Sequence, residues 1–245
     1  MNRRRTLVIG DIHSGLRALE QLLTKASVIP EDKLIFLGDY VDGWSTAVET
    51  INFLLELQKS HNCTFIRGNH DELCYDWLST GIDNAVWMQH GGAATKVSYE
   101  KADETTINRH MHFYENLENY YLDTENRLFL HAGFTNLKGV AFEYFATTFY
   151  WDRTLWELAQ SLNPELPESD VRYPKRLIHY KEVYIGHTPI SKKLSKVVPM
   201  KAANVWNIDT GAAFKGPLSM LDVDSKQVWQ SDPAHTFYPN EKGRN

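Results

Sequence analysis

Five segments of this chain place metal-binding side chains directly after a short apolar run. They read, in chain order, GDIH at 10–13, GDYVD at 38–42, RGNHD at 67–71, HAG at 131–133 and GHT at 186–188. In an open α/β sheet, groups just beyond the carboxyl ends of parallel strands converge on one crevice. We therefore expect six potential ligands to meet in one small volume. They are Asp11, His13, Asp39, Asn69, His131 and His187.

These ligands are carboxylates, imidazoles and an amide, and no thiolate is among them. Such a set suits divalent manganese, iron or zinc better than copper(I) or an iron–sulfur cluster. Six ligands exceed the three or four of a single catalytic zinc, and they match a pair of ions roughly 3.5–4 Å apart that share a carboxylate. Such ions would neutralise a phosphoryl group and activate water. The pattern therefore predicts two divalent metal ions, with manganese as the first choice and iron or zinc as alternatives.

The elements that must position these ligands follow from the hydrophobic pattern. Strands are predicted at 7–9, 34–37, 64–66, 128–130, 183–185, 205–208 and 218–221. Amphipathic helical spacing separates the first three, which indicates βαβ units and a largely parallel sheet, and the last two are expected as meander strands that close the fold. From about residue 72 to 126, aromatic and charged residues predict a mainly helical insertion. We expect one domain over 1–230 and a frayed C-terminal tail at 231–245.

The composition excludes several other classes of protein. With 42% hydrophobic and 23% charged residues, the chain is typical of a soluble globular protein. A formal net charge of −5 predicts no nucleic-acid or membrane partner, and no apolar run approaches the roughly 20 residues of a membrane span. Cys63 and Cys74 form no disulfide framework, which predicts a cytoplasmic protein. The oligomeric state is unknown from the sequence.

The five motifs, in this order, resemble those of the metallophosphoesterases, specifically the serine/threonine phosphoprotein phosphatase (calcineurin-like) family and its bacterial relatives. Two weaker matches to the bacterial branch are GGAAT at 91–95 and YWDR at 150–153, and the segment 208–224 resembles the family's closing strands. The resemblance covers nearly the whole chain. It implies an α/β fold of the metallophosphoesterase type, a four-layer α/β/β/α sandwich with two metal ions between the sheets and a mainly helical insertion.

The resemblance also implies a role for each site residue. The first metal would bind Asp11 and His13, the second would bind Asn69, His131 and His187, and Asp39 would bridge the two. His70 would be the general acid that protonates the leaving oxygen. Asp42 would orient it, because a neighbouring carboxylate favours the protonated imidazole that can donate.

One departure from the family pattern affects substrate binding. The family usually has an arginine after the second aspartate of its GDxxD motif, whereas this chain has Gly43. An arginine there would bind phosphate through two hydrogen bonds, which it does better than any other side chain. Phosphate binding must then depend on the metals, on Asn69 and on Arg153, which we predict as the remaining clamp. Arg67 has two readings of equal weight, a substrate contact or a structural residue.

The resemblance implies a phosphatase that hydrolyses phosphomonoesters, such as phosphoserine or phosphothreonine in proteins, by attack of a metal-bridging hydroxide. One alternative is a hydrolase of dinucleoside polyphosphates of the diadenosine tetraphosphate type, which shares these motifs. Another is a non-catalytic binding module, favoured only by the missing arginine. The His70 and Asp42 pair argues against the module, because a scaffold has no need of an acid. The expected partner is a phosphorylated protein or a small phosphoester.

Overall fold

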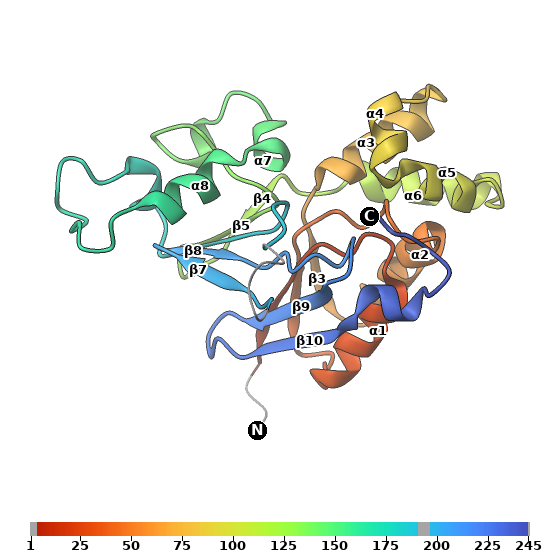
Figure 1. Cartoon of the computed structure of the whole chain (residues 1–245), viewed down its shortest axis with the longest axis horizontal. Helices are drawn as coiled ribbons and strands as arrows, with labels where there is room; N and C mark the ends of the chain where they lie inside the picture. The colour runs from red at the N-terminus through yellow and green to blue at the C-terminus, as the bar shows by residue number, and fades with distance from the viewer. Residues whose placement is uncertain (1–3, 191–196, 245) are drawn as a thin grey trace.

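The computed structural model of this protein describes residues 4–190 and 197–244. Its strands form two mixed sheets of five strands each (Figure 1). The first sheet has the order β10 (Val228–Pro233), β9 (Pro217–Asp222), β1 (Thr6–Ile9), β2 (Lys33–Phe36) and β3 (Asn62–Phe65). The second has the order β4 (Tyr120–Leu122), β5 (Arg127–Leu130), β6 (Glu182–Ile185), β8 (Val205–Asn207) and β7 (Met200–Ala202).

The second sheet has a parallel centre and two antiparallel edges, whereas the first sheet is parallel from β1 to its edge strand β3 and antiparallel on the other side. β1, β2 and β3 are parallel, joined through α1 (Leu16–Lys25) and α2 (Ala47–Leu57), as the βαβ pattern predicted. β9 and β10 add to this sheet antiparallel to their neighbours. The strands expected as one closing meander are therefore divided, because β8 pairs parallel to β6 in the second sheet while β9 pairs with β1. A short apolar run predicts a strand but carries no information on its partner.

Three separate hydrophobic cores make the four layers. The first lies between the outer face of the first sheet and its helices, with Leu19 and Ile51 among its members. The second packs α8 (Thr154–Ser161) on the other sheet through residues such as Leu155. The third lies between the sheets and includes Val8 and Phe129. The predicted α/β sandwich of four layers is confirmed by this arrangement.

The segment between β3 and β4 is mainly helical. It contains α3 (Asn69–Thr80), α4 (Ala85–Trp87), the π-helical turn η1 (Met88–Gly92), α5 (Ala93–Tyr99) and α6 (Glu104–Glu115). The helices thus begin before residue 72. Residues 120–122, which were expected to be helical, instead form strand β4, which pairs with β5. The remaining short helices are η2 (Val140–Phe142), α7 (Thr148–Trp151), η3 (Lys175–Leu177) and η4 (Ala234–Phe237). No helix among the described residues has the length and apolar character needed to span a membrane.

The expectation of a frayed tail is wrong for residues 231–244. β10 extends to Pro233, and the dark-blue segment after it runs past α1 and α2 in Figure 1. The Tyr238 ring stacks on Trp44 with 5.1 Å between ring centroids. The Glu241 carboxylate accepts a hydrogen bond of 2.8 Å from the Ser45 amide. The prolines and glycine of this segment mark turns, and its aromatic and acidic side chains bind it to the domain.

Candidate active site

The structure brings the six predicted ligands together at the carboxyl ends of the parallel strands. All six side chains are buried. Asp39 lies between two histidines, with its Oδ2 at 3.5 Å from Nε2 of His13 and 3.4 Å from Nε2 of His131. The Oδ1 of Asn69 is 2.9 Å from Nδ1 of His187 and 3.2 Å from Nε2 of His131. Side chains from five separate segments therefore share one volume between the sheets.

Two motif glycines make this close approach possible. A Cβ atom on Gly68 would lie 2.2 Å from Oδ1 of Asp39, and one on Gly186 would lie 2.0 Å from Oδ1 of Asp11. Both distances are far below van der Waals contact, so any other residue would displace the carboxylate. The glycines in RGNHD and GHT are thus required by the space that Asp39 and Asp11 occupy, in addition to any backbone bend.

The backbone around the ligands is strained. His13, Asp39, Asp42 and His187 all have positive φ angles, of 50°, 53°, 68° and 66°. Non-glycine residues adopt this left-handed conformation at a cost of about 1–2 kcal/mol each, and such strain gathers at functional sites. Backbone hydrogen bonds stabilise this conformation here. One of them runs from the His13 amide to the carbonyl of Asp39 at 2.8 Å.

Asp71, to which sequence reasoning assigned no role, connects two of these loops. Its Oδ2 accepts hydrogen bonds from the amides of Asp39 at 2.7 Å and Gly68 at 2.8 Å, and its Oδ1 accepts from the amide of Tyr40 at 2.8 Å. One buried carboxylate thus satisfies three backbone amides of residues that lie outside the strands. Its place in the RGNHD motif was the only signal for this role.

The chemistry of the buried atoms fits divalent cations. Oδ1 of Asp11 and Nε2 of His187 are buried and have no hydrogen-bond partner among the described residues. Buried polar atoms are rarely left unpaired, because the loss of water must be compensated. Two groups of residues each bring three potential ligand atoms within 4.8 Å of one another. The first group is His13, Asp39 and His70, and the second is Asp39, His131 and His187.

These two groups share Asp39, which is consistent with a bridging carboxylate. They differ from the predicted sets, since the first contains His70 and not Asp11 and the second contains no Asn69. The Oδ2 of Asp11 instead accepts a hydrogen bond of 2.9 Å from the His187 amide. Its free Oδ1 leaves Asp11 available as a ligand. Which residues bind a metal stays a prediction.

The charges of these groups are balanced within the site. Burial acts to raise the pKa of Asp39, but the positive charges of His131 and His70 bring that pKa well below its usual value. Burial lowers the pKa of His131, yet the charges of Asp39 and Asp11 raise it to about 10. Burial, and next the charge of His131, lowers the pKa of His187 to about 2. The pKa of His13 is also lowered by burial. The lowered pKa values keep the imidazoles of His187 and His13 neutral, which is the form that binds metals.

The predicted acid pair is present and is held by two further residues. Nδ1 of His70 lies 2.6 Å from Oδ2 of Asp42. Nε1 of Trp87 donates to the same oxygen at 2.6 Å, and the hydroxyl of Thr95 donates to Oδ1 at 2.6 Å. The sequence analysis did not include Trp87 and Thr95 among the site residues. Thr95 is the last residue of the GGAAT segment that resembles the bacterial branch, and Trp87 lies four positions before that segment.

A cavity of about 290 Å³ opens beside the ligand groups. It is lined by Asn69, His70, His187 and Arg153, whose Nη1 donates to the hydroxyl of Thr188 at 3.1 Å. Its lining also contains hydrophobic and aromatic side chains, which are Leu73, Val86, Trp87, Trp151, Pro189 and Phe214. Arg244, which sequence reasoning did not consider, also lines it.

Arg67 is not among the described residues that line this cavity. Its Nη1 forms an ion pair with Glu72, and its Nη2 donates to the carbonyl of Glu115 at 3.4 Å. These contacts connect β3 to helices α3 and α6. The structure therefore favours the structural reading of Arg67 over a substrate contact.

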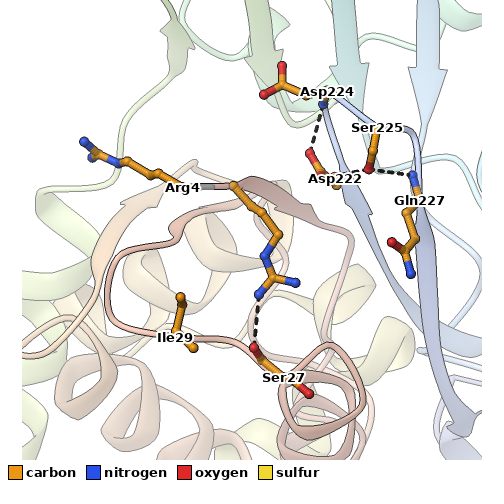
Figure 2. Close-up of a pocket in the computed structure, with 8 residues that line it drawn as sticks. Arg4, Ser27, Ile29, Asp222, Asp224, Ser225 and Gln227 are labelled. Atoms are coloured by element: carbon orange, nitrogen blue, oxygen red, sulfur yellow. Dashed lines mark hydrogen bonds between the residues drawn. The ribbon is translucent and has the colours of Figure 1, made fainter. Parts of the chain in front are cut away.

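A larger hollow of about 430 Å³ lies at the opposite, amino end of β1 (Figure 2). Two of its charged groups are already paired, since Arg5 bonds Asp32 and the hydroxyl of Ser225 donates to Asp222 at 2.8 Å. No histidine is among the described residues that line it. This hollow is larger than the cavity beside the ligand groups, but its lining residues include none of the predicted metal ligands.

Comparison with known proteins defines the class. A family model described as "Calcineurin-like phosphoesterase" matches residues 4–205, and the chain belongs to this family of metallophosphoesterases. The predicted enzyme class, a metal-dependent phosphoesterase related to the serine/threonine phosphatases and their bacterial relatives, is thereby confirmed.

Two relatives cover nearly the whole chain. The protein is 26% identical to "Bis(5'-nucleosyl)-tetraphosphatase PrpE [asymmetrical]" of Anoxybacillus flavithermus, over 97% of both chains. It is 25% identical to "Serine/threonine-protein phosphatase 1" of Salmonella typhimurium, over 91% of this chain and 93% of the relative. The fold also matches a crystal structure of a putative diadenosine tetraphosphatase, with a TM-score of 0.62 and 16% identity over 93% of this chain and 92% of the other.

Proposed function

We propose that this metallophosphoesterase hydrolyses phosphomonoesters, with phosphoserine and phosphothreonine in proteins as the expected substrates. The observation that carries this proposal is the position of Asp39, which belongs to both groups of potential ligand atoms. His70 and Asp42 lie beside these groups, and a binding module has no need of a buried proton donor. The similarity over 91% of the chain to a relative named as a serine/threonine phosphatase supports this substrate class.

Two divalent cations, manganese in preference to iron or zinc, would be held by the buried ligands. The first would bind Asp11 and His13, the second would bind Asn69, His131 and His187, and Asp39 would bridge them. When bound, such ions neutralise phosphoryl charge and supply a nucleophilic water. The free Oδ1 of Asp11 and Nε2 of His187 support this assignment, because a cation would satisfy both.

The chain's own residues would bind and protonate the substrate. His70 lines the cavity while its Nδ1 is held by Asp42, so its other ring nitrogen is available to donate to the leaving oxygen. Arg153 and the amide of Asn69 line the same cavity and would donate to the phosphoryl oxygens. In this arrangement His70 and Asn69 come from the RGNHD segment and Arg153 from another segment, and all three line one cavity.

A hydrolase of dinucleoside polyphosphates is the second candidate, and the apolar part of the cavity favours it. Trp151 and Phe214 line the cavity together with Leu73, Val86 and Pro189. A nucleobase can stack on such side chains, and each stacked base contributes about 1–3 kcal/mol. The relative of Anoxybacillus flavithermus that is named as a bis(5'-nucleosyl)-tetraphosphatase supports the same candidate.

A cytoplasmic location is part of the proposal. Cys63 and Cys74 are both free thiols, which suits a reducing compartment. The partner there would be a phosphorylated protein or a small phosphoester.

A substrate panel tests the proposal. The purified protein is stripped of metal with a chelator, reloaded with manganese, and assayed on p-nitrophenyl phosphate, a phosphoserine peptide and diadenosine tetraphosphate. We expect manganese-dependent hydrolysis of the first two, with the peptide cleaved faster than the dinucleotide. The Asp39→Asn variant serves as the control for the metal site and should be inactive. Faster cleavage of the dinucleotide would favour the second candidate, and no hydrolysis of any substrate would refute both.

A further inference from the structure

Arg244 enters the candidate active site from the C-terminal segment. Its Nη1 lies 3.5 Å from Nε2 of His13, and its guanidinium lies over the ring of Phe214 at 5.5 Å from the centroid. Its backbone amide donates to the carbonyl of Ala213 at 2.9 Å. An arginine more than two hundred residues from His13 in sequence therefore borders the ligand groups.

The stem of Arg244 occupies space left by two glycines. A Cβ atom on Gly43 would lie 3.7 Å from Cγ of Arg244, and one on Gly91 would lie 3.2 Å from it. A larger side chain at either position would compete with the arginine for the same space. Gly43 stands where the family pattern led us to expect an arginine, and the space beside it is occupied by the side chain of an arginine from another part of the chain.

The guanidinium of Arg244 has a hydrogen-bonding nitrogen without a partner among the described residues, since its Nε is buried and unpaired. Its positive charge acts on the buried carboxyl of Asp209, where it opposes the rise in pKa that burial causes, but no described carboxylate forms an ion pair with it. A buried donor on a charged group is costly to leave unpaired, so this nitrogen has a strong preference for an acceptor. An anion in the cavity would supply that acceptor.

The segment that carries Arg244 is held in place. Nε1 of Trp44 donates to the carbonyl of Ala212 at 2.9 Å, and the same ring stacks on Tyr238. Gly243 has a φ of +58°, and a Cβ there would lie 2.8 Å from the Trp44 ring, so the chain passes tightly over this tryptophan. Such anchoring places the guanidinium before a ligand arrives, which reduces the entropy lost on binding.

We propose that Arg244 is a phosphate-binding residue of this active site and that it acts with Arg153 on the phosphoryl oxygens of the substrate. Both arginines line the cavity that contains Asn69 and His70. Guanidinium groups bind phosphate through paired hydrogen bonds that a lysine cannot reproduce. This inference rests on the proposed hydrolysis of phosphoesters. In it, Arg244 replaces the phosphate-binding arginine that the family usually has at the position of Gly43.

Phosphate binding by variant proteins tests the inference. Wild type, Arg244→Gln, Arg244→Lys and the surface control Arg172→Gln are loaded with manganese, and the affinity for inorganic phosphate is measured by calorimetry. Loss of a charge-assisted contact should weaken phosphate binding in Arg244→Gln by roughly tenfold to a hundredfold. Arg244→Lys should recover part of the loss. Arg172, which pairs with Asp170 on the surface, should match wild type.

Metal content and hydrolysis of p-nitrophenyl phosphate complete the experiment. We expect Arg244→Gln to retain the manganese content and melting temperature of wild type while its kcat/KM falls with its phosphate affinity. If wild type is active and Arg244→Gln binds phosphate equally well, the inference is wrong and the proposed function stands. A changed manganese affinity with unchanged phosphate affinity would also overturn it. If wild type hydrolyses no phosphoester but the variant loses phosphate binding, the inference stands and the proposed function fails.

Discussion

Asp42 offers a test of the proton donor that does not remove the donor itself. Its carboxylate accepts hydrogen bonds of 2.6 Å from His70, Trp87 and Thr95. Asparagine has nearly the same shape, and its amide oxygen can keep facing His70 and Trp87. Its NH₂ group would face Thr95, whose hydroxyl can turn from donor to acceptor. Asp42→Asn should therefore fold normally and lose only the negative charge beside His70.

The expected loss of activity follows from the energies of these hydrogen bonds. A hydrogen bond to a charged group contributes about 1.5–3 kcal/mol, and a neutral one about 0.5–1.5 kcal/mol. The substitution should then weaken the hold on His70 by roughly 1–1.5 kcal/mol. Because about 1.4 kcal/mol corresponds to a factor of ten, kcat should fall roughly tenfold on phenyl phosphate, whose leaving group needs a proton. On p-nitrophenyl phosphate the loss should be smaller.

Four proteins complete this test, namely wild type, Asp42→Asn, His70→Asn and the double variant. His70→Asn should lower kcat on phenyl phosphate by about 10²–10⁴, the usual contribution of a general acid. If Asp42 acts only through His70, the double variant should be no slower than His70→Asn alone. Equal losses of Asp42→Asn on both substrates, or losses that multiply in the double variant, would refute the reasoning.

Two further substitutions test the metal site and the stability of the domain. Gly186→Ala should displace Asp11, since the new Cβ would lie 2.0 Å from its Oδ1, and manganese binding measured by calorimetry should weaken at least about tenfold; wild-type affinity would contradict this. Asp32→Asn should lower the free energy of unfolding by about 1–3 kcal/mol at neutral pH, because its buried carboxylate accepts hydrogen bonds from Arg5. Burial acts to raise the pKa of Asp32, but the hydrogen bonds from Arg5 and the Ile29 amide lower it overall. Its stabilisation is thus present above the unfolded pKa of about 3.9 and is lost as the pH falls through the lower folded value, so urea unfolding should show the variant and wild type converging in acid.

The sequence located the ligand groups because each belongs to a local pattern. A buried strand followed by glycine and a polar residue can be recognised within a few positions, as at Gly10-Asp11 and Gly186-His187. The geometry of parallel strands then requires such groups to converge, whatever the length of chain between them. The layers of the fold follow in the same way from alternating strands and helices.

Contacts between distant segments left no such local pattern. The pairing of β8 with β6 and of β9 with β1 joins strands that are far apart in the chain, so no local pattern reveals it. The tail was expected to fray from its prolines and glycine, whereas its stack on Trp44 could be seen only in three dimensions. Trp87 and Thr95 likewise gain their role through Asp42, which lies in another loop.

The sequence by itself determined the class of chemistry, since the types of side chain at the strand ends select divalent metals and phosphoryl transfer. Tertiary structure alone decided which charged groups border those ligands. Arg67, beside a motif, is engaged by Glu72, while Arg244, far from every motif, reaches His13. The physical reason is that coordination chemistry depends on residue type, which can be read locally, but the placement of a free charge depends on the packing of the whole chain.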